Sequence, residues 1–247
     1  MGWRIPRPFS CVAVGILIAA ELTLRVSVAA SSVAADPPAA WNPGAVKAPR
    51  LAQDKAFPRI PDAARNPSNP LGPGHFPTET DTLTIQQARD AYNANRADMV
   101  AGYRLSGVPA AAEYHKWKRY NTAPYRSSTH GNWYINNYAN RIGRAYGKYQ
   151  DAGVMPLGAV LAKDSFAVAA DGAMRVGPLF LMEKMEAGFN PDTGDWRYAM
   201  IMPDGSVYGV TKGENSANVR FCVPCHAAVG DNRDHLYFPP RGVRVNR

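Results

Sequence analysis

The sequence predicts an α+β fold, with a predominantly antiparallel β-sheet arranged as a meander and a few helices. Two observations predict it. Residues 84–104 have apolar positions at helical spacing, whereas residues 153–210 are short apolar segments separated by the Asp, Asn, Pro and Gly that turns require. The chain shows no internal repeat, and it has no alternation of strands with long helices that would suggest a parallel sheet. With 247 residues, 46% of them hydrophobic, it can bury a sizeable core.

Residues 1–35 have the features of a secretory signal peptide. Basic residues precede the apolar run "CVAVGILIAA", and small residues follow it up to Ala35, where we expect cleavage. The run is short for a membrane span and is followed closely by Glu21 and Arg25, which argues against an uncleaved anchor. We therefore expect export to the periplasm.

The basic charge of the chain limits its partners. Removal of the leader would lower the formal net charge from +8 to +6, because three arginines and one glutamate are lost. A basic exported protein could meet an acidic partner protein or an anionic membrane surface. Nucleic acid is not expected as a partner, because the protein leaves the cytoplasm.

A proline-rich stretch separates the leader from the folded part. Residues 36–82 hold ten of the 21 prolines, in runs such as "PDAARNPSNPLGPGHFP". Proline fixes φ and lacks the N–H, so neither a helix nor a central strand can persist there. We expect an extended arm or linker over 36–82 and one folded domain over 83–247.

Three helices are expected at the start of the folded part. Thr84 and Gln87 form a capping-box pattern before the first one, over 84–104, and a second, short helix follows Pro109. The third is expected within 131–149, "GNWYINNYANRIGRAYGKY". Its apolar stripe would be formed by Ile135, Tyr138, Ile142 and Tyr149.

The segment "FCVPCHAAVG" places Cys222, Cys225 and His226 within one helical turn. At positions i, i+3 and i+4 these side chains fall on one side of the helix. Two thiols can then reach the two vinyl groups of one haem while the histidine reaches the iron. Pro224 is tolerated, because its missing N–H would be unpaired in a first turn anyway. We therefore expect one covalently attached haem c, with His226 as the metal ligand.

Three other kinds of site use the same residue types. A Cys-x-x-Cys redox site would open a helix in a thioredoxin-like βαβ unit, which this neighbourhood lacks. A structural zinc would need further ligands, and the other histidines are not spaced as a partner pair. A plain disulfide across so short a loop is geometrically awkward. The other histidines are His75, His115, His130 and His235.

The sixth coordination position of the iron is expected to be open. The chain has eight methionines, but none follows Cys225, whereas a small electron-transfer cytochrome has its methionine ligand after the haem motif. An open position binds small ligands. The methionines of the predicted strands are expected to pack in the core; they are Met182, Met185, Met200 and Met202.

The order of these motifs resembles the cytochrome P-460 family, which includes the cytochrome c′-beta proteins. The resemblance covers about 115–240, through "HGNWYINNYAN", "MPLGAVLAKDSF", "GPLFLMEKMEAGFNPDTGDWRYAMIMPDGSVYG" and "FCVPCHAAVGDNRDHLYF". It implies a predominantly antiparallel β fold, a c-type haem, His226 as proximal ligand and an open distal side. The arm and the helix over 84–104 depart from the small members of the family.

Members of the cytochrome P-460 branch tie a lysine nitrogen to a meso carbon of the haem, and Lys163 of "GAVLAK" is the position that resembles it. Lys184, also in a predicted strand, is the competitor. The resemblance further implies hydroxylamine oxidation, in which a nearby carboxylate accepts protons. Glu183 and Glu186 are the candidates for that base.

Aromatic and histidine side chains complete the set of site candidates. A distal pocket lined by Phe166 or Phe180 would favour binding of a small diatomic such as nitric oxide over chemistry. His130 and His235 could carry protons or provide a sixth ligand, although loop positions suit satisfied histidines better. The segment "DNRDHLYFPP" is expected to pack beside the haem.

The leading hypothesis is an exported mono-haem c-type cytochrome that acts as a redox enzyme on hydroxylamine or a related small nitrogen compound. The alternative is a non-catalytic nitric oxide-binding or electron-transfer haem protein of the cytochrome c′-beta kind. The expected partners are a small nitrogenous ligand or substrate and a redox partner protein. A second copy of the chain, as a homodimer, is also considered.

Overall fold

The computed structural model describes residues 82–168 and 174–246. The predicted signal peptide over 1–35 and nearly all of the predicted arm over 36–82 lie outside these described residues. Within the described ranges, no helix is long and apolar enough to cross a membrane.

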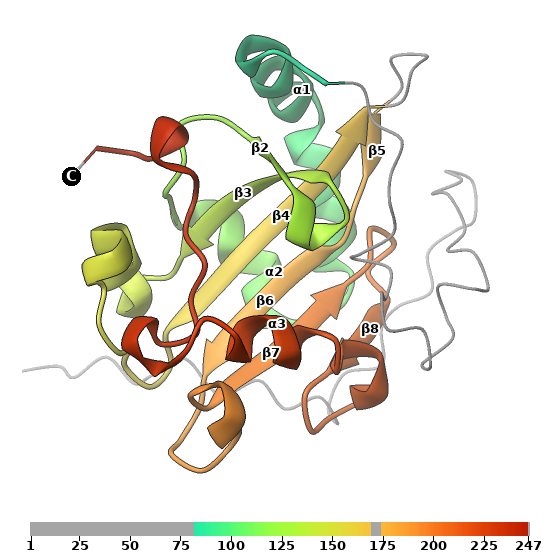
Figure 1. Cartoon of the computed structure of the whole chain (residues 1–247). Helices are drawn as coiled ribbons and strands as arrows, with labels where there is room; N and C mark the ends of the chain where they lie inside the picture. The colour runs from blue at the N-terminus through green and yellow to red at the C-terminus, as the bar shows by residue number, and fades with distance from the viewer. Residues whose placement is uncertain (1–81, 169–173, 247) are drawn as a thin grey trace, which may run out of the picture. The chain divides into compact units, whose positions relative to one another are not determined.

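Among the described residues, eight strands form one antiparallel sheet (Figure 1). The order along the sheet is β1-β3-β4-β6-β7-β8, with β2 also paired to β3 and β5 to β4. This arrangement confirms the predicted α+β class with an antiparallel meander. The strands are β1 (Lys118–Arg119), β2 (Tyr125–Ser127), β3 (Trp133–Ala139), β4 (Val160–Val168), β5 (Met174–Val176), β6 (Leu179–Lys184), β7 (Trp196–Ile201) and β8 (Val207–Val210).

The first two predicted helices are present. Helix α1 (Ile85–Arg104) begins at a capping box, in which the Thr84 hydroxyl accepts from the Gln87 N–H and the Gln87 side chain accepts from the Thr84 N–H. Helix α2 (Pro109–Glu113) has proline at its first position. A third α-helix, α3 (Cys222–Ala227), lies near the C-terminus. Short 3₁₀ turns include η4 (Ser128–His130), η5 (Ile142–Asp151), η6 (Pro191–Thr193), η7 (Ser216–Val219), η8 (Asp231–Arg233) and η9 (Arg241–Val243).

The prediction of a helix within 131–149 is wrong. Residues Trp133–Ala139 form strand β3, and only Ile142–Asp151 are helical, as the 3₁₀ turn η5. Aromatic and β-branched residues suit a strand, and β3 pairs with β4 from Tyr134↔Phe166 to Ala139↔Leu161. The spacing of apolar residues looked helical because nearly the whole strand is buried, so apolar residues are not confined to alternate positions.

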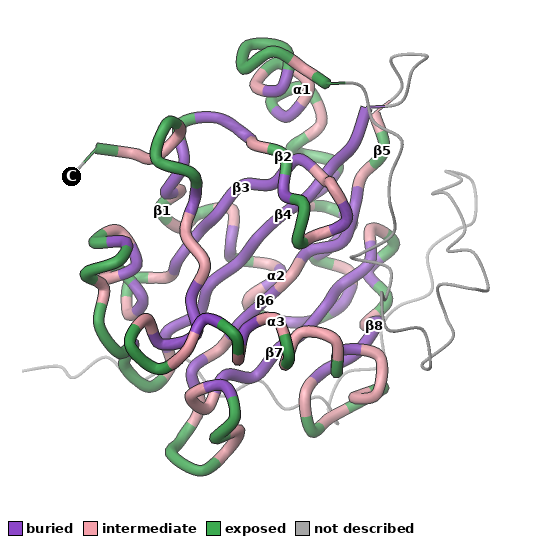
Figure 2. Tube along the Cα trace, in the orientation of Figure 1, coloured by how far each residue is buried: buried purple, intermediate pink, exposed green. Residues whose placement is uncertain are grey.

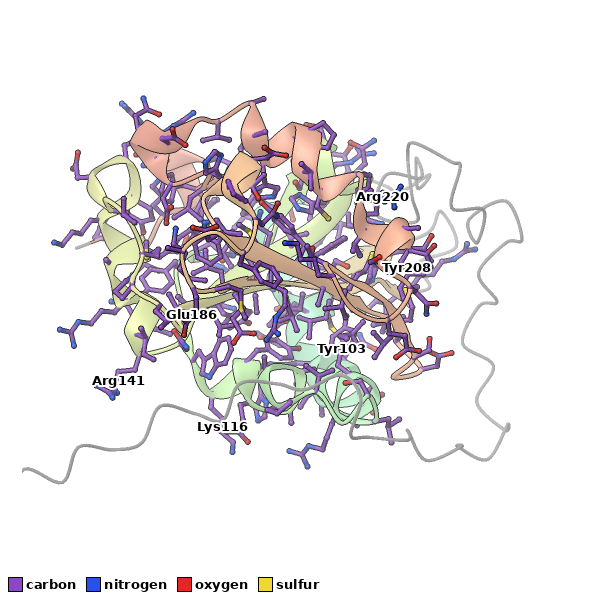
Figure 3. All side chains as sticks on the ribbon, turned by 90° about the horizontal axis from the view of Figure 1, so that it is seen from below. Tyr103, Lys116, Arg141, Glu186, Tyr208 and Arg220 are labelled. Atoms are coloured by element: carbon purple, nitrogen blue, oxygen red, sulfur yellow. The ribbon has the colours of Figure 1, made fainter. Side chains whose placement is uncertain are left out.

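The sheet separates two buried regions (Figures 1 and 2). On one face, Tyr92, Met99 and Tyr103 of α1 pack with residues of β3, β4, β6 and β7. On the other face, α3 and the C-terminal segment pack over β4, β6 and β7. Figure 3 looks at the same chain from below, with α1 and α2 under the sheet and the C-terminal segment above it. Because successive strand residues point to opposite faces, the side chains of β4 pack alternately into the two buried regions.

The α1 face holds a buried carboxyl group, Asp164, in a polar network. The Tyr92 hydroxyl donates to Asp164 Oδ2 at 2.7 Å, and Asn136 Nδ2 donates to Oδ1 at 3.0 Å. The Tyr138 hydroxyl lies 2.6 Å from that of Tyr92. Asp164 is fully buried. Its burial raises the pKa to about 6, although these hydrogen bonds oppose the shift.

Replacement of Asp164 should therefore change how stability depends on pH. The folded pKa of about 6 lies above the ordinary value of 3.8, so between these values the native state holds a proton that the unfolded state has lost. The free energy of unfolding should accordingly fall as the pH rises through this range, by up to about 3 kcal/mol from this group. In Asp164→Asn this contribution should be absent.

Urea denaturation at a series of pH values from 4 to 7 measures the effect. The exposed Asp98 of α1 provides the matched control, and Asp98→Asn should keep the dependence of the parent protein. Equal pH dependence in Asp164→Asn and the parent would contradict the prediction.

Candidate functional site

A pocket lies between the sheet and α3. It is open to solvent on one side, so helix α3 and the sheet form its walls. Its lining is mostly apolar and aromatic, with a few polar groups. The residues that line it include Thr129, His130, Asn137, Tyr146, Leu161, Lys163, Phe180, Met182, Tyr198, Phe221, Cys222, Cys225, His226, Leu236 and Tyr237.

Helix α3 brings the predicted attachment residues to this pocket. Cys222, Cys225 and His226 all line it. Both cysteines are half-buried free thiols. Burial raises the pKa of Cys222 to about 12, with the neighbouring Cys225 adding to the shift, so this thiol is protonated. The sequence motif therefore corresponds to one side of a short helix that faces a pocket.

The orientation of His226 suits an axial ligand. Its Nδ1 donates to the carbonyl of His235 at 2.8 Å, which leaves Nε2 as the nitrogen with a free lone pair. Burial lowers the pKa of His226 to about 3, and the charge of Lys163 adds to this effect. The imidazole is therefore neutral, as metal coordination requires. Its ring lies between those of Tyr198 and Tyr237, with centroids at 5.1 and 5.4 Å.

The rival sites gain no support in the described part of the chain. No group of three His, Cys, Asp or Glu side chains there is arranged to hold a metal ion, which leaves zinc without a ligand set. Cys222 and Cys225 are not joined by a disulfide. His75 lies outside the described residues.

Lys163 points into the pocket from the middle of β4. It pairs with Asn137 of β3 and Phe180 of β6, both of which also line the pocket, and it is only 8% exposed. Burial lowers its pKa to about 8, while Cys222 opposes the shift. Within the described ranges its amine makes neither a hydrogen bond nor an ion pair. A buried amine of this kind is costly unless something in the pocket engages it.

The competitor, Lys184, does not face the pocket. Its amine donates to Asp234 Oδ1 at 2.5 Å and to the Gly194 carbonyl at 2.6 Å. Both members of this ion pair are buried. Asp234 in turn accepts from the Met155 N–H, and its carbonyl accepts from the Trp196 indole. Lys184 thus ties the C-terminal segment to the sheet.

The predicted carboxylate bases are not in the pocket. Glu183 alternates with Met182 on β6, so it points to the other face, where it forms an ion pair with Arg197 of β7. Glu186 is exposed beyond the end of β6. None of the residues that line the pocket is an Asp or Glu. The positions of Glu183 and Glu186 therefore do not support their predicted role as the base.

The aromatic and histidine candidates are divided by the sheet. Phe180 lines the pocket, whereas Phe166 lies on the α1 face against Tyr92 and Tyr134. His130 lines the pocket at the end of η4, and its ring lies edge-on to Phe180 with centroids 4.9 Å apart. The loop position of His130 in the sequence gave no sign of this contact.

His235 has a positioning role instead. Its Nδ1 lies 3.2 Å from the His226 carbonyl, so the two histidines contact each other's backbone. Its Nε2 lies 2.8 Å from Asp231 Oδ1. The segment after α3 packs beside the site as expected, because Leu236 and Tyr237 line the pocket.

The pocket residues that were not singled out from the sequence include Asn137 and Tyr146. Asn137 Nδ2 donates to the Tyr146 hydroxyl at 2.9 Å, and that hydroxyl donates to the Tyr237 carbonyl at 2.7 Å. The signal that could have found Asn137 is its place opposite Lys163 in the sheet, which becomes visible only once 133–139 is recognised as a strand.

The residues of the pocket fit a c-type haem. Two free thiols and a neutral imidazole line one pocket, and the Nε2 of that imidazole is available to a metal. The apolar and aromatic lining suits the body of a porphyrin. No other set of pocket residues in the described ranges is arranged to bind a metal.

Comparison with known proteins agrees with this assignment. The family model for cytochrome P-460 matches residues 111–238, which is more than half of the chain. The match begins in α2 and ends after the pocket segment that follows α3. A search of curated proteins found no match.

The buried pair Lys184–Asp234 should dominate the stability of the closing segment. Lys184→Met would leave the Asp234 carboxylate buried without its cation, and the free energy of unfolding should fall by about 3 kcal/mol or more. In Lys184→Met/Asp234→Asn the loss should be smaller, because no charge remains. Denaturant unfolding of the variants measures both.

An exposed ion pair supplies the control. Lys116 and Glu113 lie 2.9 Å apart with more than half of each side chain exposed, so Lys116→Met should cost less than about 1 kcal/mol. Equal losses in Lys184→Met and Lys116→Met would show that the buried pair has no special role.

Proposed function

This chain belongs to the cytochrome P-460 family, and on that premise we propose that it is a mono-haem c-type cytochrome that oxidises hydroxylamine or a related small nitrogen compound. The observation that supports this most directly is the Lys163 amine, buried in the same pocket as the attachment cysteines and His226. Members of the cytochrome P-460 branch tie a lysine to the haem, and Lys163 is the position that resembles it. Membership itself establishes a haem protein, and the activity is our proposal.

Four side chains would hold the haem. Cys222 and Cys225 would form the two thioether bonds, and His226 would coordinate the iron through Nε2. Lys163 would bond to a meso carbon of the ring. Bound there, the haem would supply an iron with a position for a small nitrogen ligand and a redox couple to accept its electrons.

The low pKa of Lys163 favours the neutral amine, whose lone pair a bond to the meso carbon would need. That bond would replace one amine N–H and the meso C–H, so two protons and two electrons would leave, and an oxidant of the peroxide class would have to take up the electrons. With a pKa of about 8, roughly a tenth of the amine is neutral at pH 7, whereas an exposed lysine is almost wholly protonated. A covalent link would also remove the cost of keeping an unpaired amine buried.

Proton transfer in the pocket would depend on His130. Oxidation of hydroxylamine releases protons, and the lining offers an imidazole at this position but no carboxylate. An imidazole can accept a proton near neutral pH. Ser127 and Thr129 orient the ring, with their hydroxyl oxygens 3.1 and 3.2 Å from Nδ1.

A non-catalytic role in binding nitric oxide is the second candidate. Phe180 lines the pocket and contacts His130, and a phenyl ring at a ligand site favours a small diatomic over a polar substrate. The missing carboxylate also favours binding over chemistry. The fate of Lys163 separates the two candidates.

The cellular setting is part of the proposal. The N-terminal sequence pattern supports export and cleavage near Ala35, which would place the haem domain in the periplasm. There an acceptor protein would take up the electrons. Association into a homodimer also remains a proposal.

Peptide mass mapping of the holoprotein tests the links to the haem. The mass of the haem should be found on the peptide that contains Cys222 and Cys225, and it should also join this peptide to the one that contains Lys163. In Lys163→Met the second link should disappear while the thioethers remain, and the reduced absorption spectrum should become that of an ordinary c-type haem.

Two results would count against these links. Covalent haem retained by Cys222→Ser/Cys225→Ser would contradict the attachment site. An unmodified Lys163 peptide with an ordinary c-type spectrum in the parent protein would remove the cross-linked enzyme and leave the binding protein.

His130→Gln tests the assignment of the base. Loss of the imidazole should lower kcat for hydroxylamine oxidation roughly 100-fold, because general base catalysis contributes at least that much. Steady-state assays with an artificial electron acceptor measure it. Glu186→Gln is the matched control and should keep the parent rate, since Glu186 is exposed away from the pocket. If Glu186→Gln lowered kcat and His130→Gln did not, Glu186 would be the base instead of His130.

A further inference from the structure

A basic surface forms where three segments meet beside the pocket. We call it the basic face; its residues are Lys118, Arg144, Lys148, Arg241 and Arg244. Backbone hydrogen bonds join two of the segments: the Thr122 N–H donates to the Val243 carbonyl at 2.7 Å, and the Val245 N–H to the Tyr120 carbonyl at 3.2 Å. A side-chain bond joins the third, since Arg244 Nη1 donates to Gln150 Oε1 at 2.7 Å. The face is therefore one connected surface of the folded domain.

Basic residues outnumber acidic ones in the segments that form the basic face. Lys118, Arg144, Lys148 and Arg241 are exposed. In the stretches 118–124, 141–151 and 240–246, the single acidic residue is Asp151. Clustered charges of one sign raise the local potential and attract partners of the opposite sign.

Aromatic rings connect this face with the pocket. Tyr146, which lines the pocket, lies 5.4 Å from the ring of Tyr120 and 5.1 Å from that of Phe238. Phe238 lies 6.2 Å from Tyr149. The basic groups cover the outer rings, with Arg244 at 4.4 Å from Tyr149 and Lys118 Nζ at 5.4 Å from Tyr120.

The backbone beneath the face is held in a fixed conformation. Tyr149 has a φ of 55° and a ψ of −123°, outside the helical range of η5. Its hydroxyl donates to the Val245 carbonyl at 2.7 Å and lies 3.2 Å from the Tyr120 carbonyl. Such a strained residue persists only where the surrounding structure holds it, so the face is preformed.

The loop that leaves η5 adds apolar surface near the face. Val154 is 71% exposed and Leu157 is 58% exposed, and among the described residues only Ile85 is also classed as an exposed large hydrophobic. A stable protein interface combines apolar contacts with a polar, charged surround. Two exposed apolar side chains next to a cationic surface fit that composition.

We propose that the basic face, together with Val154 and Leu157, is the docking site for an acidic electron-transfer protein. This rests on the proposed function, because the partner collects the electrons released in the pocket. In each encounter one electron leaves the reduced protein and reduces the partner's metal by one unit, for example Cu(II) to Cu(I). The aromatic contacts favour a redox protein over an anionic membrane, since they join this surface to the pocket.

Binding to plastocyanin, an acidic blue-copper protein, tests the docking site. Calorimetric titration at low ionic strength should give a dissociation constant that rises roughly tenfold or more in Arg144→Glu/Lys148→Glu. Raising the ionic strength should weaken binding of the parent and reduce this difference. Carbodiimide cross-links between plastocyanin and the parent should map to Lys118 and Lys148.

Arg220→Glu is the matched control for the single reversal Arg144→Glu, which should also weaken binding, since each of these variants changes the net charge by −2. Arg220 is exposed and lies at the opposite end of the domain from Arg141, which begins the segment of η5 (Figure 3). This control should bind plastocyanin as the parent does. Equal weakening in both variants, or weakening in Arg220→Glu alone, would overturn the proposal.

Vesicles that contain phosphatidylserine test the alternative. If Arg144→Glu/Lys148→Glu loses vesicle binding but keeps its affinity for plastocyanin, the face is a membrane contact and the proposal fails. Both experiments measure binding and do not require the protein to oxidise hydroxylamine. Failure of the proposed hydroxylamine activity would therefore leave the docking result interpretable, and the reverse also holds.

Discussion

The pleat of β4 places two neighbouring residues of opposite charge on opposite faces of a buried strand. Lys163 and Asp164 cannot pair with each other, so each face must accommodate one of them separately. Tyr92 and Asn136 bind Asp164 under α1. Lys163 has no such partners among the described residues and faces the pocket. The sheet therefore has a hydrophobic core with one buried polar network on one side and a cofactor site on the other.

The pocket is closed by the last part of the chain, and this closure orients the axial ligand. The Lys184–Asp234 pair holds the closing segment to β6, and Asp234 and His235 both have positive φ values, at which non-glycine residues need support. His235 then supplies the carbonyl that orients His226. A distant ion pair thus contributes to the geometry at the site, because the same short segment serves both.

The lining of the pocket contains features that suit each of the two proposed functions. An amine with a lowered pKa and a histidine favour a reactive site, whereas a phenyl ring and the lack of a carboxylate favour a site that holds a small ligand. Lys163 and His130 support the proposed enzyme, because a site that only binds an apolar ligand would need neither an amine nor an imidazole. A basic surface joined to the pocket by aromatic contacts agrees with a protein that passes electrons onward.

The sequence by itself determined the features that depend on neighbours along the chain. These are the capping box at Thr84, the turn-separated strands and the Cys222–His226 motif, where the spacing alone places three side chains together. Tertiary structure decided the rest. Strand β3 resembled a helix, and Lys163 and Lys184 looked alike as lysines at the ends of apolar runs. Their different roles follow from register and pairing with distant strands, which local spacing does not specify.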